Sequence, residues 1–313
     1  MTSNKRSTVS LLVSLAAPCA AQTAWQPSSG HTQVPIWPGA VPDARPVEGP
    51  EVSGTVVDGV GSPRLVAGRP WVYVNRVSQP TLTVYPPEER NTGAAVVVFP
   101  GGGYNVLAID LEGTEACDWL TSKGITCVLL KYRVPCLKSG PYLDCLTALE
   151  DAQRTVGLVR FHAVEWHIDP RKIGVLGFSA GGHMVAAMST LFEKRLYPPV
   201  DAADKESCRP DFAVALYPGH LAVRETGFAL NPALHVSNRT PPTFLLQAQD
   251  DPTDPVENSL VYYAALRKAG VPAEMHVFVT GGHAFGLRRT ESPITGWPQL
   301  VETWLGTIGM ISK

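Results

Sequence analysis

One short segment of the sequence places a potential nucleophile between the glycines that would expose it. In Gly177-Phe178-Ser179-Ala180-Gly181, the serine follows an apolar run and precedes small and apolar residues. The Gly-x-Ser-x-Gly spacing lets a strand reverse sharply into a helix, and the glycines leave room for a strained backbone that lifts the hydroxyl clear. We expect Ser179 to be a nucleophile, although so short a motif also fits an ordinary turn serine.

A serine hydroxyl needs a base, and that base must be held in one tautomer by an acid. His283 follows the last apolar run of strand type, and Asp250, Asp251 and Asp254 follow the run before it. The order serine, aspartate, histidine is that of α/β-hydrolases. The alternative is a surface histidine and a turn cluster whose carboxylates only bind local backbone N–H groups.

Stabilising the negative oxygen of a tetrahedral intermediate is usually the largest catalytic contribution. The glycine run after "VVVFP" can turn its backbone N–H groups inward, so we expect an oxyanion hole made by Gly102, Gly103 and Ala180. A phosphate-binding loop is the alternative for such a run, but no GK[ST] and no Rossmann spacing accompanies it.

Strand and helix patterns alternate from about residue 80 onward, which predicts the elements that position these groups. Near-continuous apolar strands are buried on both faces, so we expect one mostly parallel sheet with helices on both faces and no separate cap domain. Ser179, the aspartates and His283 then all follow the carboxyl ends of strands, where such sheets bind ligands. The predicted strands are 82–87, 94–103, 125–133, 172–178, 212–218, 243–249 and 273–280, and the predicted helices are 112–124, 143–166, 181–192, 255–270 and 296–309.

Length and composition suit one large α/β domain. The chain has 313 residues, 44% of them hydrophobic, and a formal net charge of −2, which gives no electrostatic reason to expect a nucleic-acid or membrane partner. Residues 1–21 resemble a signal peptide, because Lys5 and Arg6 precede a short apolar run and small residues. Residues 22–70 are a Pro- and Gly-rich lead-in, and 71–313 are the predicted catalytic domain.

An exported chain would retain five cysteines, so at least one thiol pairs outside the chain or stays unpaired. We expect a disulfide between Cys136 and Cys145, which bracket a Gly-Pro turn segment. The alternative there is two buried thiols. Cys117 and Cys127 are predicted to be buried core thiols in a helix and a strand.

Several motifs together resemble the secreted α/β-hydrolase carbohydrate esterases described as acetylxylan or bifunctional acetyl/feruloyl esterases. They are "PGGGY", "EG" before a helix, "LLKYRVP", "DAQRTVGLVR", "IGVLGFSAGGHM", "RPDFAVALYPG", "DDPTDPVENS" and "GGHAFG". The resemblance implies that Asp251 is the triad acid, since Pro255 and Ser259 follow it at the family's spacing. Pro100 stands where lipases of the hormone-sensitive type carry a histidine, which counts against that group.

The resemblance implies a serine esterase that deacetylates plant polysaccharide such as acetylated xylan, acting through an acyl-enzyme. The alternatives are a general short-chain esterase or lipase, a peptidase on the same fold, and a non-catalytic binding protein. We expect no cofactor and no metal, because no His/Cys/Asp cluster has ligand spacing, and a small-molecule or polysaccharide ester as partner, met in the periplasm or outside the cell. The candidate substrate contacts are Tyr104, Asn105, Asp110 and Tyr217.

Overall fold

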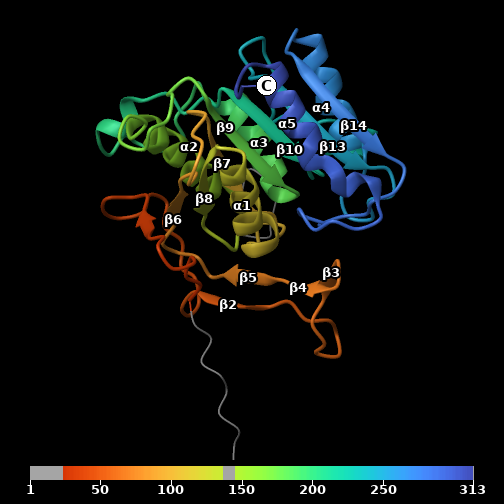
Figure 1. Cartoon of the computed structure of the whole chain (residues 1–313), viewed down its shortest axis with the longest axis horizontal. Coiled ribbons are helices and arrows are strands. Elements are labelled where there is room, and N and C mark those ends of the chain that lie inside the picture. The colour runs from red at the N-terminus through yellow and green to blue at the C-terminus, as the bar shows by residue number, and fades with distance from the viewer. Residues whose placement is uncertain (1–23, 137–144, 313) are drawn as a thin grey trace, which may run out of the picture.

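The structure is a computed structural model that describes residues 24–136 and 145–312. The predicted signal peptide lies outside these residues. The core is an eight-stranded sheet, parallel from β8 to β14, with β6 and β1 added antiparallel at one edge (Figure 1). Its order is β1 (Gln33–Pro35), β6 (Thr81–Tyr85), β8 (Thr126–Lys131), β7 (Ala95–Phe99), β9 (Ile173–Phe178), β10 (Phe212–Leu216), β13 (Thr243–Ala248) and β14 (Ala273–Phe278).

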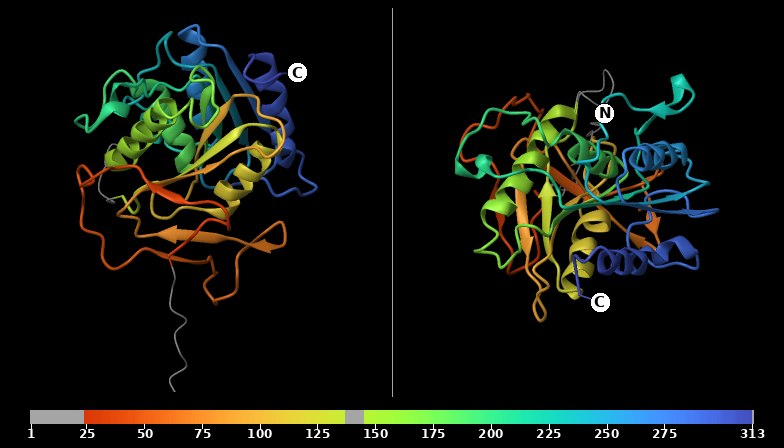
Figure 2. Two further views of the ribbon diagram at one scale, coloured as in Figure 1. Left: turned by 60° about the vertical axis from the view of Figure 1, so that its left-hand side comes forward. Right: turned by 90° about the horizontal axis from the view of Figure 1, so that it is seen from above.

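Helices cover both faces of this sheet, so the predicted α/β-hydrolase fold is confirmed. Figure 2 shows α1 (Glu115–Ser122) and α5 (Trp297–Thr307) on one face. The other face carries α2 (Leu146–Phe161), α3 (Ala180–Leu191) and α4 (Glu257–Lys268). Every residue of β7, β8, β9, β10 and β13 is buried, as expected for strands covered on both sides.

The end of α2 differs from the prediction, because the helix stops at Phe161 and not at residue 166. Residues 162–167 form turns, and the Ile168 N–H donates to the Ala163 carbonyl. His167 adopts a φ of +55°, which an α-helix cannot contain.

Parallel pairing aligns the strand ends that carry the candidate site. Phe178 at the end of β9 is in register with Leu216 of β10, and Ala248 of β13 with Phe278 of β14. The segments that follow these strands therefore emerge at one edge of the sheet. Between β10 and β13 the chain forms only β11 (Ala222–Val223), β12 (Ala229–Leu230) and a short 3₁₀ turn, η4 (Arg224–Thr226), so the part of the chain that the structure describes has no separate cap domain.

The Pro- and Gly-rich lead-in and the strand that follows it, residues 24–75, form an arm that pairs partly with itself. Antiparallel pairs join β2 (Val52–Thr55) to β5 (Val72–Asn75) and β3 (Leu65–Val66) to β4 (Arg69–Pro70), and Figure 1 shows them along one end of the molecule. The sequence predicted none of these short strands. Strand β5 also bonds to the segment after β7, since Val74 and Leu107 exchange backbone hydrogen bonds of 2.9 and 2.8 Å.

The disulfide prediction is wrong. The structure joins Cys117 of α1 to Cys127 of β8, with the two Cα atoms 5.1 Å apart, and Cys136 and Cys145 form no disulfide. A helix packed directly on the strand that follows it brings the two cysteines together, which sequence separation alone did not reveal. Among the described residues, no helix is long and apolar enough to cross a membrane.

Candidate active site

Ser179 stands on a strained turn between β9 and α3. Its backbone adopts φ +52° and ψ −117°, and its N–H donates to the Leu216 carbonyl at 3.0 Å. Both flanking positions must be glycine, because a Cβ at either one would collide with a backbone carbonyl oxygen. A Cβ at Gly177 would lie 2.1 Å from the Gly181 carbonyl oxygen, and one at Gly181 would lie 2.0 Å from that of Phe99. The motif therefore makes the sharp strand-to-helix reversal that its spacing predicts.

The structure brings Ser179, His283 and Asp251 into one chain of hydrogen bonds. His283 Nε2 lies 2.9 Å from Ser179 Oγ, and His283 Nδ1 lies 2.7 Å from Asp251 Oδ2. The other oxygen of Asp251 accepts hydrogen bonds from the backbone N–H groups of Thr253 and Asp254. A base within reach of a hydroxyl, and an acid that fixes the base, can together activate a serine nucleophile.

Asp250 has a different task from its neighbour. Its Oδ1 accepts hydrogen bonds from Gly281 N–H at 2.9 Å and Gly282 N–H at 2.8 Å. It thereby ties the loop after β13 to the loop that carries His283. Asp250 thus holds the His283 loop through the backbone of that loop, and Asp251 holds the same loop through the His283 ring.

The surroundings of His283 favour its protonated form. Burial acts to lower its pKa, but the hydrogen bond with Asp251 and the charges of Asp251, Asp254 and Glu112 outweigh burial, and the pKa is raised from its ordinary 6.5. A base made more basic by nearby carboxylates accepts a serine proton more readily.

The glycine loop after β7 lies beside Ser179. A Cβ on Gly101 would come within 3.0 Å of the Ser179 Cβ, which shows how closely the two segments approach. Gly102 and Gly103 have φ values of +126° and +62°, and no backbone hydrogen bond among the described residues uses their N–H groups. The Ala180 N–H, at the first position of α3, has no intrahelical acceptor. Such donors can bind an oxyanion.

A buried carboxylate that is not among the predicted site residues links this loop to the loop that carries His283. Glu112 accepts hydrogen bonds from the Gly101 N–H at 2.8 Å and the Tyr217 hydroxyl at 2.8 Å. The Tyr217 oxygen in turn accepts one from the Gly286 N–H, and its ring lies 5.0 Å from the His283 ring. Burial raises the pKa of Glu112, against the opposing effects of Tyr217, His283 and Gly101. The signal available in the sequence is the "EG" motif, Glu112-Gly113, at the start of the predicted helix 112–124.

The four predicted substrate contacts take different positions. Tyr217 and Tyr104 are 0% and 2% exposed, and the Tyr104 hydroxyl shares a 2.8 Å hydrogen bond with His183 Nδ1, so both tyrosines lie behind the site and not at its surface. Asp110 accepts hydrogen bonds from the Val72 and Leu111 N–H groups, which fixes the arm. Asn105 alone is exposed, with its amide donating to the Gly103 carbonyl.

Asp254 lies on the opposite side of His283 from Asp251. Its Oδ2 is 3.4 Å from Ser179 Oγ and 3.7 Å from His283 Nε2, and the residue is only 6% exposed. The sequence analysis weighed it only as an alternative triad acid. The structure instead gives the His283 Nδ1 contact to Asp251.

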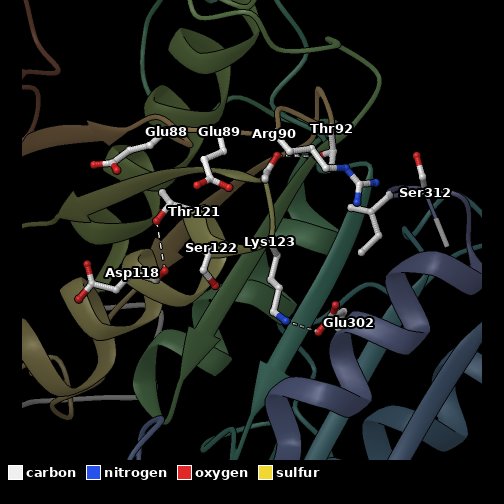
Figure 3. Close-up of a pocket in the computed structure, with 12 residues that line it drawn as sticks. Glu88, Glu89, Arg90, Thr92, Asp118, Thr121, Ser122, Lys123, Glu302 and Ser312 are labelled. Carbon is white, nitrogen blue, oxygen red and sulfur yellow. Dashed lines mark hydrogen bonds and ion pairs between the residues drawn. The ribbon is translucent and has the colours of Figure 1, made fainter.

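A separate cavity of about 610 Å³ opens at the other edge of the sheet, before strands β7 and β8 (Figure 3). Polar and charged groups line it, and Lys123 and Glu302 form an ion pair of 2.9 Å across it. Ser179 follows the carboxyl end of its strand, so this cavity lies away from the candidate active site.

Several known proteins are similar to this chain. The prolyl oligopeptidase family matches residues 150–305. An acetylxylan esterase of Xylanibacter ruminicola is 32% identical over 63% of this chain and 42% of its own, and an endo-1,4-beta-xylanase B of Butyrivibrio fibrisolvens is 29% identical over 70% and 36%. The chain thus spans about two-fifths of the length of these curated relatives.

A solved structure matches the chain over nearly its whole length. The acetyl ester-xyloside bifunctional hydrolase from Caldicellulosiruptor lactoaceticus is 33% identical, with a TM-score of 0.70, and the match covers 90% of this chain and 97% of the other. Sequence identity at that level, sustained across a complete fold, places the chain within a family and not merely within a fold class. The chain belongs to the family of α/β-hydrolases that includes this acetyl ester-xyloside bifunctional hydrolase.

Proposed function

We propose that this protein is a serine esterase that removes acetyl groups from a xylan-type polysaccharide through an acyl-enzyme. The observation that carries the proposal is the hydrogen-bonded chain from Ser179 Oγ through His283 to Asp251, with distances of 2.9 and 2.7 Å. The names of the acetylxylan esterase and the acetyl ester-xyloside hydrolase supply the substrate class.

The reaction follows from the roles of these groups. Ser179 Oγ attacks the ester carbonyl carbon while His283 Nε2 takes its proton, and the N–H groups of Gly102, Gly103 and Ala180 stabilise the developing oxyanion. The intermediate collapses as His283 returns the proton to the departing alcohol oxygen. Water then attacks the acetyl carbonyl carbon while His283 takes its proton. The bond to Ser179 Oγ breaks as His283 returns that proton to the serine oxygen, and acetate is released. Asp251 holds the imidazole in the tautomer that this sequence requires.

The proposal includes export. An N-terminal segment of signal-peptide type and the disulfide between Cys117 and Cys127 both support a protein that works in an oxidising compartment, periplasmic or extracellular. A polysaccharide substrate is met there.

A panel of p-nitrophenyl esters of rising acyl length, assayed beside acetylated xylo-oligosaccharides, tests the proposal. We expect acetate release from the oligosaccharide and no gain from longer acyl chains, because only methylene groups that become buried contribute about 0.8 kcal/mol each. Activity that rises steadily to the octanoate ester, with no acetate released from the oligosaccharide, would instead identify a lipase. Hydrolysis of a prolyl p-nitroanilide in preference to esters would support the peptidase that the family match allows.

A further inference from the structure

The backbone of Asp254 is fixed so that its side chain faces the nucleophile. Its N–H donates to Asp251 Oδ1 at 2.9 Å, and its carbonyl accepts a 2.6 Å hydrogen bond from the Gln247 amide. The segment after β10 leaves room for the Asp254 side chain only because residue 219 is a glycine. A Cβ at Gly219 would lie 2.4 Å from Asp254 Oδ1. The carboxylate therefore has a defined position beside Ser179 and His283.

Asp254 also forms part of the wall of a cavity of about 790 Å³. The segment 220–233, with the β11–β12 hairpin, forms one side, and residues 253–258 form the other. Asn258 Oδ1 accepts hydrogen bonds from the Leu221 and Ala222 N–H groups, which hold the hairpin against α4. One residue of the cavity wall, Asp254, therefore lies within hydrogen-bond distance of Ser179, and the hairpin forms the other side of the cavity.

The position of Asp254 selects which half of an ester it meets. The departing alcohol oxygen must approach His283 Nε2, because that nitrogen returns the proton to it. Asp254 Oδ2 lies 3.7 Å from the same nitrogen, so the carboxylate faces the alcohol and not the side of the ring that binds Asp251.

A carboxylate at this point accepts hydrogen bonds and repels developing negative charge. Burial raises the pKa of Asp254 to about 6, against the charge of His283, with Asp251 adding to the rise and Ser179 opposing it, so the group is mainly ionised at pH 7. On a sugar, the group that can donate a hydrogen bond to this carboxylate is a hydroxyl. The carbon next to an acetylated sugar carbon commonly carries a free hydroxyl group.

We propose that Asp254 accepts a hydrogen bond from a hydroxyl group on the carbon next to the ester-bearing carbon, and that the hairpin cavity receives the rest of that alcohol. Asp254 is then a specificity-determining residue for vicinal hydroxy esters. The inference rests on the proposed esterase function and defines the alcohol that this function takes.

Two small acetate esters that differ in a single hydrogen-bond donor test the inference. 2-Hydroxyethyl acetate carries a vicinal hydroxyl, and 2-methoxyethyl acetate replaces its hydrogen with a methyl group. Because hydrogen bonds to charged groups are stronger than neutral ones, we expect the native enzyme to favour the hydroxy ester by roughly tenfold or more in kcat/KM. This ratio should approach one in Asp254→Ala. It should take an intermediate value in Asp254→Asn, where an uncharged acceptor remains.

Glu257→Gln is the matched control, since it removes a carboxylate three residues away at the start of α4 that does not line the cavity. Its ratio should equal that of the native enzyme. Circular dichroism identifies any variant that fails to fold, and Asp254→Asn keeps the test available if Asp254→Ala does not fold. A native ratio near one, or an unchanged ratio in the folded Asp254 variants, overturns the inference. Failure of the native enzyme to cleave either ester, or cleavage that survives Ser179→Ala, overturns the esterase function itself.

Discussion

At the scale of single residues, His283 lies between two aspartates, with Asp251 Oδ2 2.7 Å from its Nδ1 and Asp254 Oδ2 3.7 Å from its Nε2. The serine motif and the order Ser, Asp, His pointed to Ser179 and His283, while the choice among three aspartates needed the family spacing. Burial was not predictable, because it depends on which distant segments pack around a side chain. The sequence therefore predicts Tyr217 and Tyr104 as substrate contacts, although the fold buries both.

Replacing Asp251 with asparagine tests whether Asp251 is the carboxylate that orients His283. An amide cannot enforce the tautomer of His283 that accepts the serine proton, so Asp251→Asn should lower kcat by roughly 10⁴. Asp250→Asn is the control, since its remaining amide oxygen can still accept from Gly281 and Gly282. It should lose far less. Steady-state kinetics with p-nitrophenyl acetate measure both, and a reversed order of losses would move the acid to Asp250.

The pH profile tests the electrostatics around His283. The imidazole must be neutral to act as base, so kcat/KM falls as pH drops through its pKa, and the raised pKa puts the midpoint above pH 6.5. The charged groups that face it are Asp251, Asp254 and Glu112. Because the charge of Asp254 contributes to the rise, Asp254→Asn should move the midpoint to lower pH, and Glu257→Gln should not. A midpoint that stays in place or rises in Asp254→Asn contradicts this electrostatic account.

At the scale of elements, apolar runs and glycine positions predicted the strands and helices that carry the site. The parallel pairing of β9, β10, β13 and β14 then aligned their ends, as the alternating pattern required. Cysteine pairing was missed for a geometric reason. The turn segment between Cys136 and Cys145 suggested proximity, whereas the packing of α1 on β8 brings Cys117 and Cys127 together.

The disulfide between α1 and β8 should contribute measurably to the stability of the fold. Replacing Cys117 and Cys127 with alanine should lower the free energy of unfolding by about 3 kcal/mol, because the unfolded chain regains the entropy of a closed loop. Urea unfolding measures the change, with Cys136→Ala as the control. Peptide mapping should find one linked pair, Cys117 with Cys127. A link between Cys136 and Cys145 would contradict the structure.

At the scale of the whole molecule, the lead-in contributes more than its composition suggested. Strand β5 bonds to the segment that follows the glycine loop, and Arg288, 4% exposed, donates to the carbonyls of Arg69 and Pro70 at 2.8 and 3.0 Å. Arg288 also pairs with Glu115 at the start of α1. The arm, the glycine loop after β7 and the loop that carries His283 therefore support one another. Sequence patterns could not predict this, since each contact joins segments far apart in the chain.

The central claim is that Ser179 attacks acetyl esters of a carbohydrate, and acetate release from acetylated xylo-oligosaccharides measures it most directly. The native enzyme should release acetate, and Ser179→Ala should lower kcat by roughly 10⁴ to 10⁶ while keeping the native circular dichroism spectrum, because the members of such a triad act as a unit. If Ser179→Ala retained more than about a tenth of the activity, or if the native enzyme released no acetate, the account would be contradicted.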